Sequence, residues 1–464
     1  MRVPPRTQGK TQARADASAV SRRLVLPVQR YIHAEEAAGL MLAIGAAIGL
    51  IWANSPWARS YEALLHKHMA VHLGPLALDK SLHHWINDGL MSLFFVVVGL
   101  EINREMVHGQ LRHIRGAALP LFAAIGGMVV PAAAYLLFNA GTDGARGWGI
   151  PVATDIAFAL GALAVLGDRV PHALRIFLLA FATVDDIGGI LVIALFYTEH
   201  LSWTWAAGAA VCALAIFVLR RLNVQSTGAY GLLGVLLWLA VLQSGVHATI
   251  AGVVFALLTP ARRATAQPEY LATSERLIQR LRDALNRSED DEAAALLGEI
   301  EERTRATEEP ADRLDRHLRP WVSYLVLPVF ALANAGVPLS WEAISRAGAS
   351  PITQGIVTGL LIGKAAGILG ASWLAVRMGV ASLPTPVSWT GVAGASVLAG
   401  IGFTVSLFIA GLAFEGEPQL DDARIAILGA SALAAVAGMA FLRWRLPRMP
   451  AGGDPLDTGA GTAC

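Results

Sequence analysis

Two adjacent carboxylates stand in the middle of the apolar stretch Leu178-Leu179-Ala180-Phe181-Ala182-Thr183-Val184-Asp185-Asp186-Ile187-Gly188-Gly189-Ile190-Leu191, which belongs to a longer apolar run over residues 173–197. As an α-helix, this run would be about 37 Å long at 1.5 Å per residue, enough to cross a bilayer. Each ionisable side chain at that depth costs about 2.5–3.5 kcal/mol on insertion scales, so a pair of aspartates there indicates an ion or proton pathway. The alternative, a soluble core helix with satisfied acids, does not fit the rest of the chain.

The composition is that of a polytopic membrane protein. Of the 464 residues, 55% are hydrophobic and only 15% are charged, and glycine occurs 46 times. This chain is more apolar and less charged than soluble domains, and its glycines suit close helix packing in lipid. The net charge of +1 gives no basic field for nucleic acid. The two cysteines, Cys212 and Cys464, predict neither a disulfide nor a thiol metal site.

Twelve apolar runs predict an all-α protein with about 12 transmembrane helices embedded in a lipid bilayer. They cover residues 37–53, 84–102, 117–138, 148–166, 173–197, 203–219, 228–242, 246–258, 321–337, 356–376, 389–412 and 425–442. Lysine and arginine are concentrated in the tails and short loops on one side of these runs, which predicts that both termini are cytoplasmic.

The expected organisation has five parts. Residues 1–31 form a cytoplasmic tail, because no short apolar core with a small-residue cleavage site marks a signal peptide. Transmembrane helices 1–8 lie within 32–260, and helices 9–12 lie within 320–446. Between them, residues 261–319 carry many charges and two apolar helical faces, which predicts a cytoplasmic helical insert, either simply solvated or regulatory. Residues 447–464 form a second cytoplasmic tail.

A small β-hairpin is expected outside the membrane near residues 69–80. The sequence alternates there around the turn Gly74-Pro75. Because the edges of such a hairpin are open to pairing, a second copy of the chain could add to it and form a homodimer.

Two further charges lie in the middle of other spans. Asp155 is about 12 residues, or 18 Å, from the loop at 167–171, and Asp186 is about 15 residues, or 22 Å, from it. Antiparallel neighbours would therefore hold both acids at similar depth. Asp185 and Asp186 point about 100° apart around a helix, so one can bind a cation while the other pairs with Lys364, in the run 356–376.

The span 389–412 has a glycine-dense centre that includes Gly400 and Gly402, and Thr154-Asp155 occupies the same place in the span 148–166. A pair of interrupted apolar segments in two halves of a chain indicates a transporter site made from crossed, unwound helices. Close packing alone would also explain the glycines, but the acids favour the broken helix. Carboxylates, the Thr154 hydroxyl and freed carbonyls supply the oxygens that a hard cation prefers, and protons compete for the same oxygens.

At these residues the chain resembles the NhaA family of bacterial Na⁺/H⁺ antiporters. The resemblance covers about residues 32–446 outside the insert and is carried by Trp85-Ile86-Asn87-Asp88-Gly89-Leu90, Gly99-Leu100-Glu101-Ile102-Asn103-Arg104-Glu105, Ala153-Thr154-Asp155-Ile156-Ala157-Phe158, Val184-Asp185-Asp186, Ser244-Gly245-Val246-His247-Ala248-Thr249, Phe330-Ala331-Leu332-Ala333-Asn334-Ala335-Gly336, Gly363-Lys364 and Gly402-Phe403-Thr404. It implies inverted repeats with two crossed discontinuous helices. It also implies a location in the bacterial inner membrane, no cofactor and no enzymatic reaction.

The resemblance implies a role for each buried charge. Asp155 and Asp186, with Thr154, would bind Na⁺ or Li⁺, and Asp185 would pair with Lys364 in the proton-loaded state. Either Asp185 or Lys364 would carry a second proton. Exchange of two protons for one Na⁺ would move one net charge per cycle, worth about 2.3 kcal/mol per 100 mV.

The resemblance also implies a pH response, at the cytoplasmic side through Glu101, Arg104, Glu105 and Asp315 and at the outer side through His247. A lone histidine in an apolar segment is alternatively a hydrogen-bonded packing residue. The chain departs from the family at Asp315-Arg316-His317-Leu318-Arg319-Pro320-Trp321, where an acid followed by two histidines is common. Arginine stays charged across the physiological range, so this departure argues against the family's form of pH regulation and leaves the transport site intact.

Two other functions are compatible with buried aspartates. A Na⁺-coupled solute symporter would need a pocket for an organic substrate. An intramembrane aspartyl protease would need two aspartates sharing a proton. Such a protease has no use for a buried lysine, and neither Val184-Asp185 nor Thr154-Asp155 has the Gly-x-Gly-Asp setting. Proton release on adding Na⁺ or Li⁺ would separate the three.

Overall fold

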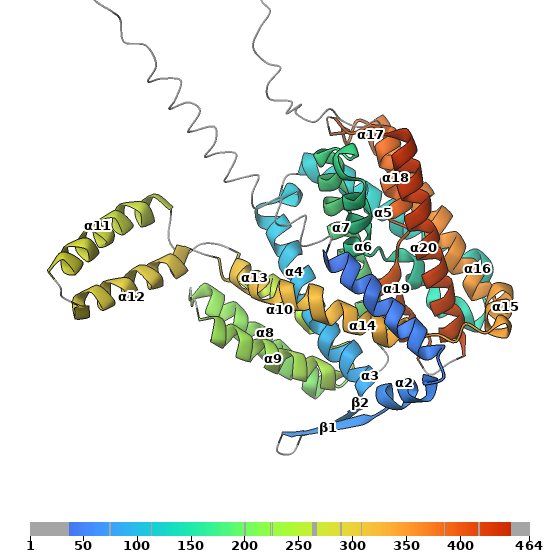
Figure 1. The fold of residues 1–464 in the computed structure, drawn as a ribbon, viewed down its shortest axis with the longest axis horizontal. Helices are drawn as coiled ribbons and strands as arrows, with labels where there is room; N and C mark the ends of the chain where they lie inside the picture. The colour runs from blue at the N-terminus through green and yellow to red at the C-terminus, as the bar shows by residue number, and fades with distance from the viewer. Residues whose placement is uncertain are drawn as a thin grey trace, which may run out of the picture.

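The computed structural model describes residues 37–446 apart from positions 74–75, 113, 199–200, 223, 225, 262–266, 288–289, 308, 385 and 416–417. The two predicted tails, 1–31 and 447–464, lie outside the described residues. Nearly all of the described chain is helical, and most helices pack side by side in one bundle (Figure 1).

A first helix, Ala37–Ala53, opens the described chain. The elements that follow are α2 (Ala58–Leu65), β1 (His68–Leu73), β2 (Leu76–Ser81), α3 (Leu82–His84), η1 (Trp85–Leu90), α4 (Met91–Val107), η2 (Gln110–Arg112), α5 (Ile114–Asn139), η3 (Asp143–Val152), α6 (Ile156–Val165), η4 (Gly167–Arg169), α7 (His172–Phe196), α8 (Trp203–Arg221), α9 (Thr227–Ser244), α10 (Thr249–Leu258), α11 (Gln267–Asn286), α12 (Asp290–Thr307), α13 (Pro310–Trp321), η5 (Val322–Val326), α14 (Leu327–Asn334), α15 (Trp341–Ala349), α16 (Pro351–Thr358), η6 (Gly359–Gly363), α17 (Lys364–Arg377), α18 (Trp389–Leu398), α19 (Phe403–Ala413) and α20 (Gln419–Arg445).

The prediction of an all-α polytopic membrane protein is confirmed, but the count of 12 spans is not. Within the described ranges, 8 helices are long and apolar enough to cross a membrane, and up to 11 if each of three bent pairs counts as one span. The predicted span 246–258 appears only as the short apolar helix α10. The first bent pair, Ala37–Ala53 with α2, turns by 116°, so α2 does not continue the span.

Three of the long helices contain a π-helical turn, at η1, η5 and η6. Such turns widen a helix locally and often occur at functional sites. η5 begins two residues after Pro320, which has no backbone N–H to donate to the preceding turn. η6 ends at Gly363, immediately before Lys364.

Strands β1 and β2 form an antiparallel pair in which His68 lies opposite Ser81 and Leu73 opposite Leu76. The pair lies at one end of the bundle, next to α2 and α3 (Figure 1). Met69 and Val71 on β1 are exposed. The structure contains a single copy of the chain, so dimerisation through this hairpin stays a prediction.

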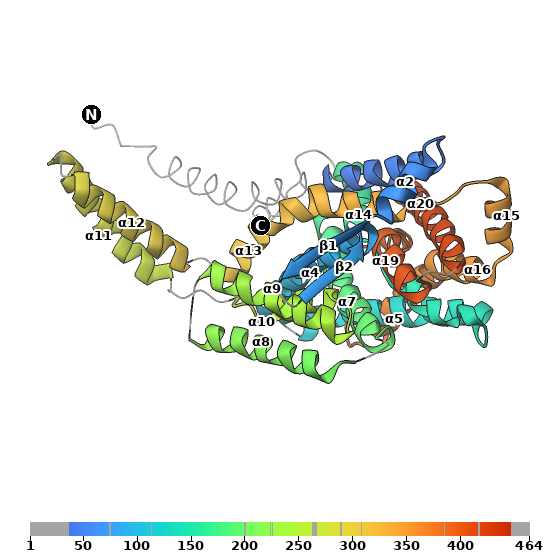
Figure 2. The same ribbon diagram turned by 90° about the horizontal axis from the view of Figure 1, so that it is seen from below.

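The charged insert contains two helices, α11 and α12, which lie side by side and project away from the bundle in both views (Figures 1 and 2). Their facing side chains form a small apolar cluster of their own: Leu277, Ala284, Ala293 and Leu296. Helix α13 begins at Pro310, inside the predicted insert, and continues through η5 and α14 as one apolar span, Pro310–Ala335. Proline at the first turn suits a helix start, because its missing N–H would have no partner there.

Glycine lets α5 and α17 approach each other closely. An added Cβ at Gly126 on α5 would lie 2.2 Å from the carbonyl oxygen of Gly367 on α17, and one at Gly367 would lie 2.1 Å from that of Gly126. No larger residue fits at either position without moving a backbone. This close approach fixes α17 against α5 and so sets the position of Lys364, one turn before Gly367.

Candidate functional site

Two helices are interrupted at mid-length, and the interruptions touch. η3 and α6 meet at residues 153–155 with a bend of 44°, and α18 and α19 meet at residues 399–402 with a bend of 45°. The backbone N–H of Asp155 donates to the carbonyl of Ile401 at 2.6 Å. The predicted pair of crossed, discontinuous helices is therefore present, and unpaired backbone groups of one interruption are satisfied by the other.

A single carboxylate caps both half-helices that begin at this crossing. Asp155 accepts a hydrogen bond from the backbone N–H of Phe158 in α6 at 3.0 Å. Its other oxygen accepts from the N–H of Thr404 in α19 at 3.1 Å and from the Thr404 hydroxyl at 2.5 Å. Helix N-termini carry partial positive charge and unpaired N–H groups, so the nearly buried Asp155 stabilises both at once.

The glycines at the second interruption permit close packing and also lie where the helix is interrupted. A Cβ at Gly400 would lie 2.4 Å from the carbonyl oxygen of Leu360 in η6. One at Gly402 would lie 2.2 Å from the Ser406 hydroxyl. Nearby, the Thr154 hydroxyl donates to the carbonyl of Ala399 at 3.0 Å. Both explanations of these glycines, close packing and helix interruption, therefore apply.

Asp185 and Lys364 form an ion pair that is completely buried. The Lys364 Nζ lies 2.7 Å from Asp185 Oδ2, and both side chains are 0% exposed. The ring of Phe181, one helical turn before Asp185, lies 5.7 Å from the same nitrogen. Removing one partner of such a pair leaves a buried charge without compensation, which typically costs about 3–5 kcal/mol.

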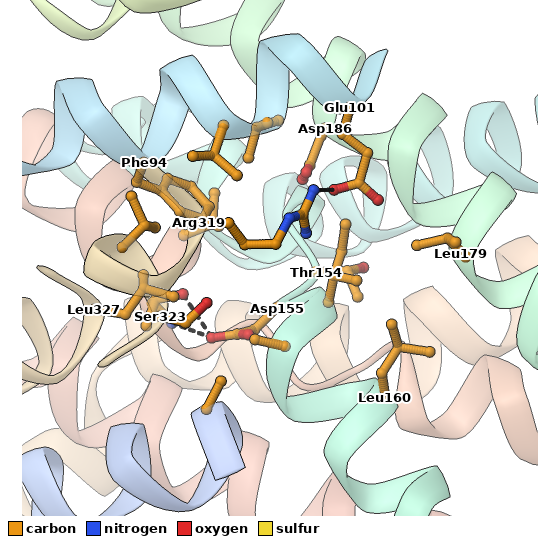
Figure 3. A pocket seen from close by; sticks show the side chains of 18 residues that line it. Phe94, Glu101, Thr154, Asp155, Leu160, Leu179, Asp186, Arg319, Ser323 and Leu327 are labelled. Atoms are coloured by element: carbon orange, nitrogen blue, oxygen red, sulfur yellow. Dashed lines mark hydrogen bonds and ion pairs between the residues drawn. The ribbon is translucent and has the colours of Figure 1, made fainter. Parts of the chain in front are cut away.

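Asp186 has different surroundings although it is the next residue. Its side chain lines a cavity of about 90 Å³ together with Asp155, Thr154, Thr404 and Glu101 (Figure 3). In the part of the chain that the structure describes, no side chain or backbone group donates a hydrogen bond to the Asp186 carboxylate. Asp186 therefore offers oxygens to a ligand in the cavity, whereas Asp185 is occupied by Lys364.

The residues predicted to set the pH response do not form one group. Glu101 lines the cavity, and Asp315 contacts it indirectly through Arg319, whose guanidinium pairs with both acids. Arg104 is exposed and does not line the cavity, and Glu105, one residue on, does not line it either.

His247 lies at the other end of the bundle, near the hairpin. It lines a separate cavity of about 780 Å³ there, and its Nε2 lies 2.5 Å from the carbonyl oxygen of Tyr197. This contact is the hydrogen-bonded packing arrangement named as the alternative for a lone histidine.

Sequence reasoning missed the role of Thr404 and the position of Arg319. Thr404 follows the interruption by two residues, and a hydroxyl in the first turn of a half-helix was the available signal. Arg319 stood out as a departure from the family pattern, but nothing in the sequence placed its side chain in the cavity. Ser323, one turn further along the same helix, also lines it.

Comparisons with known proteins agree across the whole bundle. The family model described as Na⁺/H⁺ antiporter 1 matches residues 29–442. The Na⁺/H⁺ antiporter NhaA of Rhodopirellula baltica is 44% identical over 436 residues, covering 92% of this chain and 96% of that protein. The NhaA of Anaeromyxobacter sp. (strain Fw109-5) is 46% identical over 436 residues, covering 93% and 94%.

Among solved structures, the sodium proton antiporter MjNhaP1 from Methanocaldococcus jannaschii at pH 8 aligns with 91% of this chain and 99% of its own. The TM-score is 0.48 and the sequence identity 12%, a likeness too distant to support an argument about the site.

Proposed function

Because the chain belongs to the NhaA family of Na⁺/H⁺ antiporters, we propose that the cavity at its two crossed helix interruptions is where Na⁺ and protons replace each other. The protein is a multi-pass membrane antiporter. The observation that carries the proposal is the contrast between two neighbouring acids: Asp185 is neutralised by Lys364, while Asp186 faces the cavity opposite Asp155 with its oxygens available.

A bound Na⁺ would be held by Asp186 and Asp155, with the Thr154 hydroxyl close by. Each carboxylate oxygen has two lone pairs, so Asp155 can cap the two half-helices and still contact a cation. Two carboxylates give the cavity a negative charge that one cation partly balances, and Li⁺ meets the same requirement. A proton that binds to this pair of acids removes one of its two negative charges and weakens the attraction, so Na⁺ leaves when the proton binds.

The buried pair gives the cycle its second proton. When Na⁺ binds, Asp185 and Lys364 lie close enough to the charged site to lose a proton from one of them, which makes the exchange two protons for one Na⁺. Each cycle then moves one net charge inward, and a membrane potential drives Na⁺ export at about 2.3 kcal/mol per 100 mV. Lipid surrounds the bundle, and we place the protein in the bacterial inner membrane.

The orientation follows from the basic ends of the helices. Arg220 and Arg221 end α8, and Arg443 and Arg445 lie in the last turn of α20. Positive charge at helix ends marks the cytoplasmic face, so both termini are cytoplasmic and the β-hairpin is external. The cavity with Asp186 then opens toward the cytoplasm, where Glu101 lies near the end of α4.

The size of the cavity separates an antiporter from the alternatives. A volume of about 90 Å³ has room for an ion and a few waters, far below the roughly 300–1,000 Å³ of pockets for organic ligands. A symporter that binds its organic solute beside Asp155 and Asp186 is therefore disfavoured. A protease is disfavoured on the same ground, because a cavity of this volume has no room for a peptide segment beside Asp155 and Asp186.

The test is proton movement in everted membrane vesicles that carry the chain, with a pH-sensitive dye. Adding Na⁺ or Li⁺ to vesicles with an established pH gradient is expected to release protons without any added solute. A requirement for an organic solute would establish the symporter instead. Vesicles that give no response to either ion at any pH from acid to alkaline would refute the exchange.

A further inference from the structure

Arg319 brings a fixed positive charge to the wall of the same cavity. It lies in the last turn of α13, and its Nε lies 3.2 and 3.1 Å from the two carboxylate oxygens of Asp315. Its Nη2 lies 3.0 Å from Asp315 Oδ1 and 3.5 Å from Glu101 Oε2 on α4. Figure 3 shows the guanidinium beside Glu101, reaching across the cavity from the opposite wall.

The helix geometry explains why Arg319 points inward. Arg319, Ser323 and Leu327 follow one another at intervals of four residues along α13, η5 and the start of α14, and all three line the cavity. Residues with this spacing share one face of a helix. Arg319 occupies the end of this row where Glu101 is 19% exposed, whereas Asp155 is 2% exposed.

The charges around Arg319 come from every neighbouring element. Three carboxylates line the cavity, from α4, α7 and the break before α6: Glu101, Asp186 and Asp155. Asp315 faces the guanidinium from its own helix, and Glu105 on α4 acts electrostatically on Glu101. Among the described residues that line the cavity, Arg319 is the one basic side chain.

We infer that Arg319 is a tethered competitor of the transported cation: its guanidinium weakens the attraction of the cavity for Na⁺ and so sets the Na⁺ concentration at which exchange is half-saturated. The inference rests on the proposed function and adds a residue that determines affinity. A cavity lined by acids concentrates cations, and a fixed positive charge at its mouth opposes that effect. Because a guanidinium does not deprotonate at physiological pH, the competition is present at every working pH.

The first experiment compares the apparent KM for Na⁺ of Arg319→Gln with that of the unchanged protein, in proteoliposomes at one alkaline pH. Losing the charge is expected to lower KM by about threefold or more, because Na⁺ no longer meets a competing cation. Arg319→Lys keeps the charge and is expected to stay near the original KM. The matched control is Arg316→Gln, since Arg316 is an exposed arginine on the same helix that does not line the cavity.

A second experiment uses chemical replacement and does not depend on the glutamine variant being recovered in folded form. In Arg319→Ala, added guanidinium ion at millimolar concentration is expected to raise KM toward the original value. The unchanged protein should respond much less to the same addition, because the Arg319 guanidinium already occupies the mouth of its cavity. Equilibrium binding of ²²Na⁺ to the purified full-length protein gives the same comparison without transport.

An unchanged or higher KM in Arg319→Gln, or an equal guanidinium effect in Arg319→Ala and the unchanged protein, would overturn the inference. Its failure is distinguishable from failure of the proposed function. If only the inference fails, the unchanged protein still exchanges Na⁺ for protons, with an affinity that does not depend on Arg319. If the proposed function fails, the unchanged protein shows no Na⁺-dependent proton movement at all.

Discussion

The two ends of the bundle hold two very different cavities. The one with Glu101 and Arg319 at its mouth is small, about 90 Å³, and reaches Asp155 and Asp186. The one at the hairpin end is about 780 Å³ and is lined by many charged side chains and histidines, but none of the mid-membrane aspartates lines it. Volume is therefore not the basis for the proposed transport site, which is placed by contact with the helix interruption at Thr154-Asp155.

The barrier between the two cavities is short and aromatic. Thr404 lines the smaller cavity, and Phe408, one turn further along α19, lines the larger one. The ring of Phe408 lies 5.6 Å from that of Phe95 and 6.4 Å from that of Phe330. At its other end the smaller cavity is lined by the partly exposed side chains of Glu101 and Arg319. The proposed exchange requires a second state in which the aromatic barrier opens and access beside Glu101 closes.

The largest effect is expected from an acid in the smaller cavity. Asp186→Asn should reduce Na⁺-driven proton movement in vesicles to the background rate, because the proposed site loses the carboxylate to which no described residue donates a hydrogen bond. Asp421→Asn changes an acid that lines the larger cavity and should leave the rate within about twofold. Equal loss in the two variants would remove the distinction between the cavities.

The next largest effect is expected from Lys364→Ala, which should lower the stability of the folded protein. The change leaves Asp185 buried without its partner and is expected to cost about 3–5 kcal/mol of unfolding free energy, seen as a lower Tm in detergent. The double change Lys364→Ala with Asp185→Asn removes both charges and should recover part of the loss. A Tm that does not move in the single variant contradicts the ion pair.

A smaller, pH-dependent effect is expected at the larger cavity. The hydrogen bond from His84, at 2.7 Å, lowers the pKa of Glu415. A group whose pKa is lower in the folded protein stabilises it above the group's ordinary pKa, and that contribution disappears as the pH falls through the lowered value. The Tm of Glu415→Gln should therefore lie slightly below that of the unchanged protein near neutral pH and converge with it in acid. A constant difference across that range would argue against the contact.

The smallest effect is expected from the projecting helices. Removal of residues 267–307 deletes α11 and α12, whose apolar cluster is their own. The maximal exchange rate should remain within about twofold, because neither cavity loses a lining residue. The pH profile of the shortened protein then decides between the two interpretations of the insert. A shifted profile shows regulation, and an identical one shows a solvated connection.

The sequence predicted the buried charges well, because charge inside a membrane is costly and is retained only with a partner or a function. That cost predicted that one of the two neighbouring aspartates pairs with Lys364, and the family resemblance identified Asp185 as the partner that the structure shows. The crossing at Asp155 was predictable from two interrupted apolar segments. Thr404 was not, since the sequence does not show which half-helix start faces which acid.

The exact number of spans is not confirmed, and the position of Arg319 could not be predicted from the sequence. The sequence counted residues 246–258 as a span, whereas the structure has there only the 10-residue helix α10, which packs against α4. α13 begins within a charged segment, so its inward-facing row could not be read as part of a membrane helix. Hydropathy identifies long apolar helices, but it does not identify the polar helix ends that line an ion pathway.

The central claim is that Na⁺ and protons replace each other on Asp155 and Asp186. Isothermal titration of the purified protein with NaCl, in two buffers that differ in ionisation enthalpy, measures Na⁺ binding and proton release together. The account predicts that protons are released as Na⁺ binds, and that Asp186→Asn abolishes both signals. Na⁺ binding without proton release across the neutral and alkaline range would contradict it.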